Sequence, residues 1–234
     1  MDELLSIDRD SVRVFLQRWY GFAGSVARET ACMESDVPPE LAEWYQTSLL
    51  TGVPVTFQDH PIDVTALVRE ADGMLPFWVE NQHGFYWAVN PSRDDRQVFC
   101  RESGASEWRT TGESLETFLL HCAVREAIIG AEWKFTEFIE ESKLQDSLQN
   151  FSRLNFVSLA SEEPEATLWC GMDSLARLTL PPAGYGRPDE QIWMLTIAAS
   201  NEANIQKCAS RFGQQLPGEN NACSTGEFDE RPPF

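Results

Sequence analysis

Histidines, cysteines and adjacent carboxylates are the side chains with which this sequence could carry out acid–base, nucleophilic or metal chemistry. The chain has three histidines, which lie far apart in the sequence: His60, His83 and His121. None of them shares metal-ligand spacing with a cysteine. The pairs Asp94-Asp95 and Glu162-Glu163 could act as a general acid and a general base. Adjacent acids in polar loops are more simply solvated side chains, so neither pair identifies a reaction.

The six cysteines give no catalytic pattern either, because none belongs to a C-x-x-C motif. Cys100, Cys122 and Cys170 lie in apolar runs, which is typical of small core side chains. An apolar strand offers Cys100 nothing that would lower the pKa of its thiol. The G-x-S-x-G, Walker and G-x-G-x-x-G patterns are also missing from the sequence. We therefore predict that the chain is not an enzyme and that it uses no cofactor and no metal.

The charge of the chain restricts its partners. Its 234 residues include 37 acidic and 18 basic side chains, a formal net charge of −19. The excess is spread over the chain, with 21 acidic against 10 basic residues before position 131. Such a surface repels phosphate backbones, which argues against direct binding of nucleic acid, and it attracts a basic partner. Acidity can also serve solubility alone. With neither a signal peptide nor a long apolar run, the sequence predicts a cytoplasmic protein that makes no membrane contact.

The elements that would position a site alternate between helical and strand-like stretches. The apolar spacing predicts helices over residues 8–20, 36–52, 114–129, 131–151 and 201–212. Alternation and turn residues predict strands over 53–110 and again between 154 and 200. This order predicts an α+β fold in which an antiparallel twisted sheet packs against helices. The polar residues 213–234 are predicted to be a disordered tail.

The stretch "FWVENQHGFYWAVN" (residues 77–90) is predicted to be the central hairpin of the sheet. Side chains of a strand alternate between its two faces, so Phe77 and Val79 should point away from Trp78. An apolar face of this kind predicts packing against a helix, and the helix at 114–129 is the expected cover. The alternative is that Trp78 or Tyr86 faces solvent and anchors a protein interface.

Residues 37–130 resemble the SUKH superfamily, in particular its immunity-protein-like members. The resemblance rests on "PPELAEWYQTSLLTG", "ENQHGFYWAVN", "RQVFCRE", "SEWRTT" and "ESLETFLLHCAVREAIIG", in that order. A looser match over about 155–212 rests on "LWCGMDSL" and "IWMLTIAAS" and is similar to a C-terminal strand-helix extension. The resemblance implies three parts: an N-terminal helix and linker (1–35), a SUKH-like domain (36–212) whose extension begins near 131, and the tail (213–234). His83 departs from the family pattern because it lengthens the turn before Gly84.

The resemblance also implies a non-enzymatic binding protein. Its members include immunity proteins that neutralise toxin domains, many of them nucleases, and regulatory scaffolds. Acidic side chains of such a protein could mimic phosphates in the groove of a basic toxin, with aromatic anchors adding affinity. The residues predicted to make this contact are Asp94, Asp95, Glu102, Glu107, Trp108, Glu80 and His83. Each of them is otherwise explained as part of a solvated sheet edge. A scaffold or adaptor that inhibits nothing is the second hypothesis, and an enzyme with a close His–carboxylate or Cys–His pair is the third.

Overall fold

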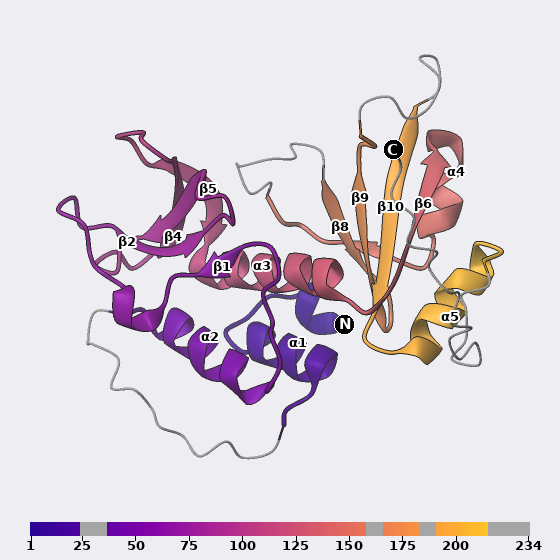
Figure 1. The fold of residues 1–234 in the computed structure, drawn as a ribbon, viewed down its shortest axis with the longest axis horizontal. Coiled ribbons are helices and arrows are strands. Elements are labelled where there is room, and N and C mark those ends of the chain that lie inside the picture. The colour runs from indigo at the N-terminus through magenta and orange to yellow at the C-terminus, as the bar shows by residue number, and fades with distance from the viewer. Residues whose placement is uncertain (24–36, 158–165, 183–190, 215–234) are drawn as a thin grey trace, which may run out of the picture.

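The computed structural model of the chain describes residues 1–23, 37–157, 166–182 and 191–214 (Figure 1). Its helices are α1 (Ser11–Tyr20), α2 (Pro39–Leu50), α3 (Leu115–Gly130), α4 (Glu141–Leu148) and α5 (Glu202–Arg211), with short 3-10 helices at Asp2–Leu4 and Val64–Ala66. Its strands are β1 (His60–Pro61), β2 (Leu75–Val79), β3 (Phe85–Val89), β4 (Gln97–Glu102), β5 (Arg109–Ser114), β6 (Trp133–Glu140), β7 (Ser152–Arg153), β8 (Thr167–Cys170), β9 (Ser174–Thr179) and β10 (Ile192–Ala199).

In the described residues these strands form two antiparallel sheets. The first runs in chain order, β1-β2-β3-β4-β5, and is therefore an antiparallel meander. The second has the order β6-β10-β9-β8-β7, so β10 lies inside it, between β6 and β9. The prediction of an α+β fold is confirmed. The strands of the last third do not extend the first sheet but form a second one.

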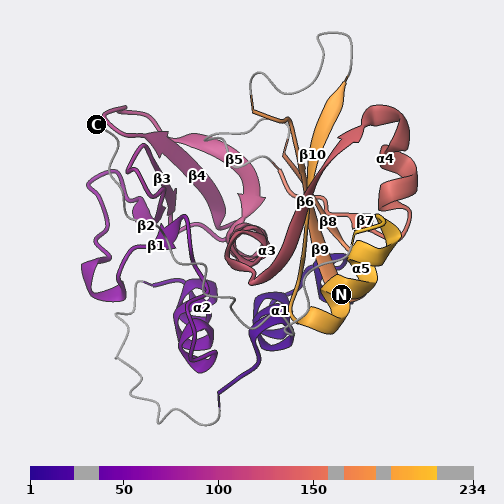
Figure 2. The same cartoon turned by 45° about the vertical axis from the view of Figure 1, so that its right-hand side comes forward.

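Helix α3 lies between the two sheets, with α1 and α2 running beside it (Figure 2). Ser114 accepts a hydrogen bond from the Thr117 amide at 3.3 Å and so caps the N-terminus of α3. Eleven of the sixteen residues of α3 are buried. A helix that is buried on every side is typical of the centre of a protein rather than its surface. The sequence predicted that α3 is buried on the side that faces the first sheet. The second sheet accounts for its burial on the opposite side.

The aromatic hairpin packs on α3 as predicted. The rings of Phe77, Trp78 and Trp87 surround that of Phe118, with centroid distances of 5.6, 6.4 and 5.9 Å. Strict alternation is nevertheless wrong here, because the register shifts between Pro76 and Trp78 and both Phe77 and Trp78 face the core. Trp78 is 1% exposed, so it belongs to the core and is not an interface anchor.

The second sheet is covered on both faces. One face contributes Leu175 and Ala198 to the core around α3, and the other carries Leu195 and Ile197 into a second core beneath α4 and α5 (Figure 2). The predicted helix over 131–151 is therefore wrong in its first half. Residues 133–140 form β6, which pairs with β10 at all eight positions.

The predicted division into three parts changes in one respect. Helix α1 is not outside the domain, because Phe15 and Leu16 are fully buried in the same core as α3. The N-terminal helix is thus integral to the fold, since its apolar stripe has α3 as a neighbour. The linker from 24 to 36, the pair Glu162-Glu163 and nearly all of the predicted tail (215–234) lie outside the described residues.

Candidate functional site

The predicted contact residues do not form one surface, because they lie at opposite ends of the first sheet. The turn from Glu80 to Gly84 and the loop between β4 and β5 share one end, where the Ser103 amide donates to the Gly84 carbonyl at 2.8 Å. The loop between β3 and β4, with Asp94 and Asp95, lies at the other end. The five residues of β3 separate the two ends by about 16 Å. The candidate site therefore divides into two separate groups.

Trp108, in the group at the β4–β5 loop, is held by two side chains. Its indole N–H donates to Asp72 at 3.0 Å, and the Arg101 guanidinium lies 4.0 Å from its ring centroid. Arg101 in turn donates two hydrogen bonds to Glu70, at 2.7 and 2.9 Å. These contacts hold the half-buried indole in place.

Four carboxylates belong to this group: Asp72 bonds the indole, Glu70 pairs with Arg101, Glu102 ends β4, and Glu107 precedes Trp108 in the loop. Glu102 and Glu107 are exposed, whereas the Arg101 charge is taken up by Glu70. A bidentate Arg–carboxylate pair leaves little positive charge to offset the other acids. We call the group formed by Trp108, its hydrogen-bond partner Asp72 and the exposed Glu102 and Glu107 the acidic loop face. Sequence reasoning missed Glu70, Asp72 and Arg101, since they come together across 31 to 36 residues with no shared motif.

Glu80 does not belong to a contact surface. It is 1% exposed, and its carboxylate accepts hydrogen bonds from the amides of Gln82 and Gly84, at 3.0 and 2.9 Å. The prediction that it meets a partner is therefore wrong. The Glu80 carboxylate thus caps its own turn, because the tight turn leaves the amides of Gln82 and Gly84 without strand partners.

His83 is exposed at the tip of this turn and has a positive φ of 59°. Its ring lies 6.3 Å from that of His60 and 6.4 Å from that of Tyr86. It is thus accessible at the same end of the sheet as the acidic loop face.

Asp94 and Asp95 are both exposed at the far end. Asp95 forms two hydrogen bonds with Arg93, at 2.7 and 3.1 Å, and the pKa of its carboxyl is lowered by this guanidinium. The neighbouring Arg96 pairs with Glu40 of α2. Arginines therefore neutralise much of the charge at this end.

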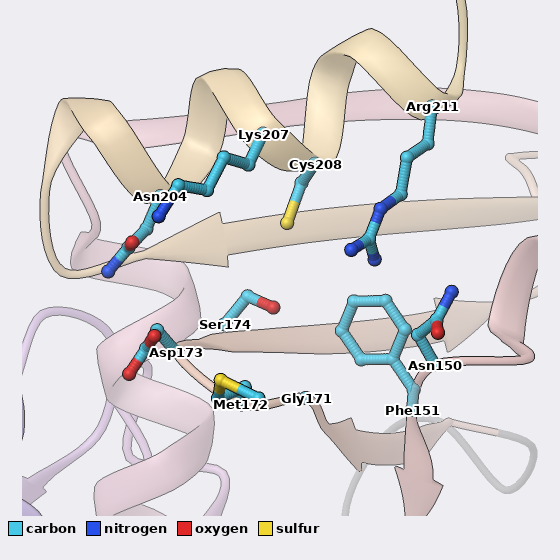
Figure 3. A pocket seen from close by; sticks show the side chains of 10 residues that line it. All are labelled: Asn150, Phe151, Gly171, Met172, Asp173, Ser174, Asn204, Lys207, Cys208 and Arg211. Carbon is cyan, nitrogen blue, oxygen red and sulfur yellow. The ribbon is translucent and has the colours of Figure 1, made fainter.

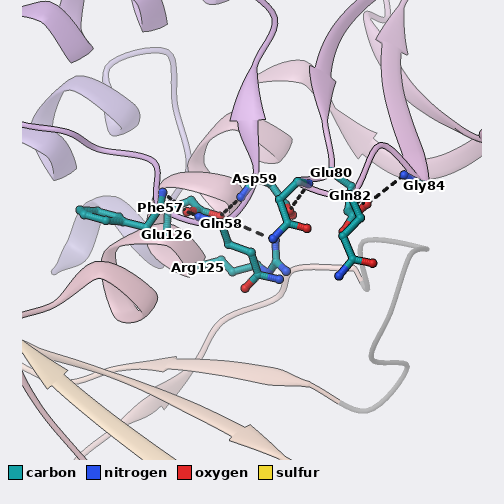
Figure 4. A network of polar contacts seen from close by, with 9 residues as sticks. Phe57, Gln58, Asp59, Glu80, Gln82, Gly84, Arg125 and Glu126 are labelled. Atoms are coloured by element: carbon teal, nitrogen blue, oxygen red, sulfur yellow. Dashed lines mark hydrogen bonds and ion pairs between the residues drawn. The ribbon is translucent and has the colours of Figure 1, made fainter.

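A buried polar network on α3 was not predicted from the sequence (Figure 4). The Glu126 carboxylate, which is fully buried, accepts hydrogen bonds from three consecutive amides of residues 57–59 at 2.5, 2.7 and 3.0 Å. Arg125 forms an ion pair with the buried Asp59. This network fastens the segment before β1 to α3. Its role is structural, because it satisfies backbone donors that belong to no strand.

His121 and Glu113 form the close His–carboxylate pair that an enzyme would require. His121 Nδ1 lies 3.1 Å from a Glu113 carboxylate oxygen, and the same oxygen accepts a hydrogen bond from the Val157 amide at 2.8 Å. Both side chains are buried, and Phe156 stacks on the imidazole at 4.6 Å. The pair joins β5, α3 and the segment after β7. In the described part of the chain, His121 and Glu113 are only 7% and 3% exposed.

Three of the thiols that the structure describes are shielded by burial. Burial raises the pKa of Cys100 and Cys170, and raises that of Cys122 well above its ordinary value. No group of three or more metal-ligating side chains occurs in the parts of the chain that the structure covers. Among those same residues, no helix is both long enough and apolar enough to cross a bilayer.

The fold and the surface together define an α+β protein with an acidic, tryptophan-containing face at one end of its first sheet. Comparison with known proteins gives no match: neither a family model, nor a curated protein, nor a solved structure is similar to this chain.

Proposed function

We propose that this chain is a non-enzymatic binding protein whose acidic loop face covers a basic surface of a partner protein. The observation that carries the proposal is the fixed Trp108 among carboxylates. Tryptophan is prominent among residues that dominate binding energy, and an immobilised side chain loses little entropy on binding. Asp72 and Arg101 have already restricted this ring before any partner arrives.

The charge around Trp108 supports a basic partner. Glu102 at the end of β4 and Glu107 in the loop after it are both exposed, and the chain as a whole carries −19. Complementary charge accelerates encounter and selects against acidic partners. The far group at Asp94 and Asp95 is less suited to this role, because Arg93 pairs with Asp95.

The finer proposal is that the protein is an immunity protein of the SUKH type that neutralises a toxin domain. Its support is the sequence resemblance over residues 37–130 together with the acidic loop face. If the toxin is a nuclease, Glu102 and Glu107 would occupy the groove of the toxin that otherwise binds the phosphates of its nucleic-acid substrate. The alternative within the same class is a scaffold or adaptor that binds its partner without inhibiting it.

The partner is identified by affinity capture from an extract of the cell that makes the protein, with three matched baits. These are the wild-type chain, Glu102→Lys/Glu107→Lys, and Asp94→Lys/Asp95→Lys, which changes the charge by the same amount at the other end. We expect a basic protein that the wild type and the Asp94/Asp95 variant retain and the Glu102/Glu107 variant loses. Equal loss with both variants, or binding that does not change with salt, would contradict the assignment to this face.

The captured partner then separates immunity from scaffolding. With purified partner, Trp108→Ala is expected to weaken binding by about 2 kcal/mol, roughly thirty-fold, while circular dichroism shows that the variant is folded. If the partner arrests growth when expressed alone, co-expression of the wild type should restore growth and the Glu102/Glu107 variant should not. A partner that is harmless alone favours the scaffold.

A further inference from the structure

A cavity of about 220 Å³ lies in the second half of the molecule, between α5 and the turn that joins β8 to β9 (Figure 3). The helix contributes Asn204, Lys207 and Arg211 to its wall, and Asn150, Phe151 and Asp173 lie on the opposite side. The cavity is remote from the acidic loop face, which belongs to the first sheet. Its possible role is therefore separate from the proposed function.

Lys207 and Arg211 line this cavity, and neither forms an ion pair with any residue that the structure describes. Lys207 and Arg211 are four residues apart on α5, so they lie on one face of the helix. Among the described residues, no acid lies within ion-pairing distance of either side chain, although Arg93, Arg96, Arg101 and Arg125 all form such pairs. Like charges at this spacing repel each other, and a bound anion would remove that repulsion.

The helix dipole favours basic residues near a C-terminus, but it does not require both to face the same cavity. Asn150 and Asn204 add amide groups that can donate to an anion. An arginine presents a planar set of donors that matches phosphate oxygens, and a lysine adds a second positive charge. Two cations with amide donors suit a dianion better than a single carboxylate.

The rest of the cavity suits a ligand whose remaining part, apart from the phosphate, carries hydroxyl groups. We call that part the hydroxylated body. The Ser174 side chain points into the space, and Asp173 offers a carboxylate that accepts hydrogen bonds. The Phe151 ring and the Cys208 thiol provide an apolar wall. We propose that this cavity binds a small phosphate monoester with a hydroxylated body, its phosphate between Lys207 and Arg211.

The test uses the full chain and four probes at low ionic strength: ribose 5-phosphate, inorganic phosphate, ribose and malate. Isothermal titration calorimetry should show saturable binding of ribose 5-phosphate, weaker binding of inorganic phosphate and none of ribose. The Arg211→Gln and Lys207→Gln variants should each bind ribose 5-phosphate at least roughly ten-fold more weakly. The matched control is Arg109→Gln, which removes an exposed arginine from β5 in the first sheet and should leave binding unchanged.

A second readout is local to the cavity. Saturating ribose 5-phosphate should slow hydrogen exchange of the backbone amides of residues 171–174, in the turn that lines the cavity. The proposal is overturned if ribose 5-phosphate does not bind at millimolar concentration or if Arg109→Gln weakens it as much as Arg211→Gln. It is also overturned if malate binds as tightly as the phosphates. Equal affinity for inorganic phosphate and ribose 5-phosphate would refute recognition of the hydroxylated body.

Discussion

Replacement of Glu126 by glutamine tests whether a single buried carboxylate holds the segment before β1 on α3. One Glu126 oxygen accepts from the amides of Phe57 and Gln58, and the other accepts from Asp59. In Glu126→Gln the amide oxygen can keep the first two bonds, but as neutral ones, and the amide nitrogen then faces the Asp59 N–H. The change from charged to neutral costs about 1 kcal/mol for each retained bond, and the lost bond costs at least about 1.5 kcal/mol.

The expected loss in free energy of unfolding is therefore about 3–4 kcal/mol, a large part of the roughly 5–15 kcal/mol that stabilises a typical domain. Urea unfolding followed by tryptophan fluorescence measures this difference. Hydrogen exchange adds a local readout, in which the amides of residues 57–59 should exchange at least about ten-fold faster.

The matched control is Glu132→Gln, which removes the same charge from an exposed side chain just after α3. Its effect should stay within about 0.5 kcal/mol. If Glu126→Gln and Glu132→Gln shift the unfolding midpoint equally, or if exchange at 57–59 is unchanged, the reasoning from these hydrogen bonds is refuted.

Three other predictions concern residues whose surroundings the structure defines. A Cβ at Gly130 would lie 2.1 Å from the Phe57 ring, so Gly130→Ala should lower stability by about 1–3 kcal/mol in urea unfolding, and by clearly less when Phe57 is already alanine. Burial raises the pKa of Tyr20 and Tyr45 above the ordinary value of 10.0. Their contribution to stability is thus complete below pH 10 and is lost as the pH rises further. Absorbance at 295 nm should show both ionising together with alkaline unfolding, and ionisation near pH 10 in a folded protein would contradict this. Burial also raises the pKa of Cys122, so iodoacetamide at pH 8 should modify it only after denaturation, whereas peptide mass spectrometry that found it modified in native protein would count against the buried position.

Sequence periodicity predicted the first sheet better than the second. The hairpin around Trp87 and the helix that begins after Ser114 follow from local patterns: alternation, a turn rich in polar residues, and a capping side chain. Residues 133–140 read equally well as a polar helix, because their charged residues suit a helix surface. They form a strand since β10, about 60 residues away, supplies a partner for each of them.

In the candidate site, too, some features were predicted from the sequence and others depend on the tertiary structure. Glu102, Glu107 and His83 were predicted to contact a partner, and all three side chains are exposed. The capping role of Glu80 was not predicted. An acid beside a turn can point outward into solvent or back at the amides of the turn, and the sequence does not distinguish the two orientations. The separation of Asp94 from Glu102 also depends on the topology of the strands between them.

The sequence by itself determined the α+β class, the apolar hairpin and its helix cover, and the acidic character of the surface. Each of these depends on neighbouring residues or on composition. Only the tertiary structure decided that Asp72 and Arg101 fix Trp108, that Glu126 binds amides 67 to 69 residues away, and that Lys207 and Arg211 share a cavity with Asp173. Such contacts join segments that are distant along the chain, and the packing of the two sheets around α3 determines which segments meet.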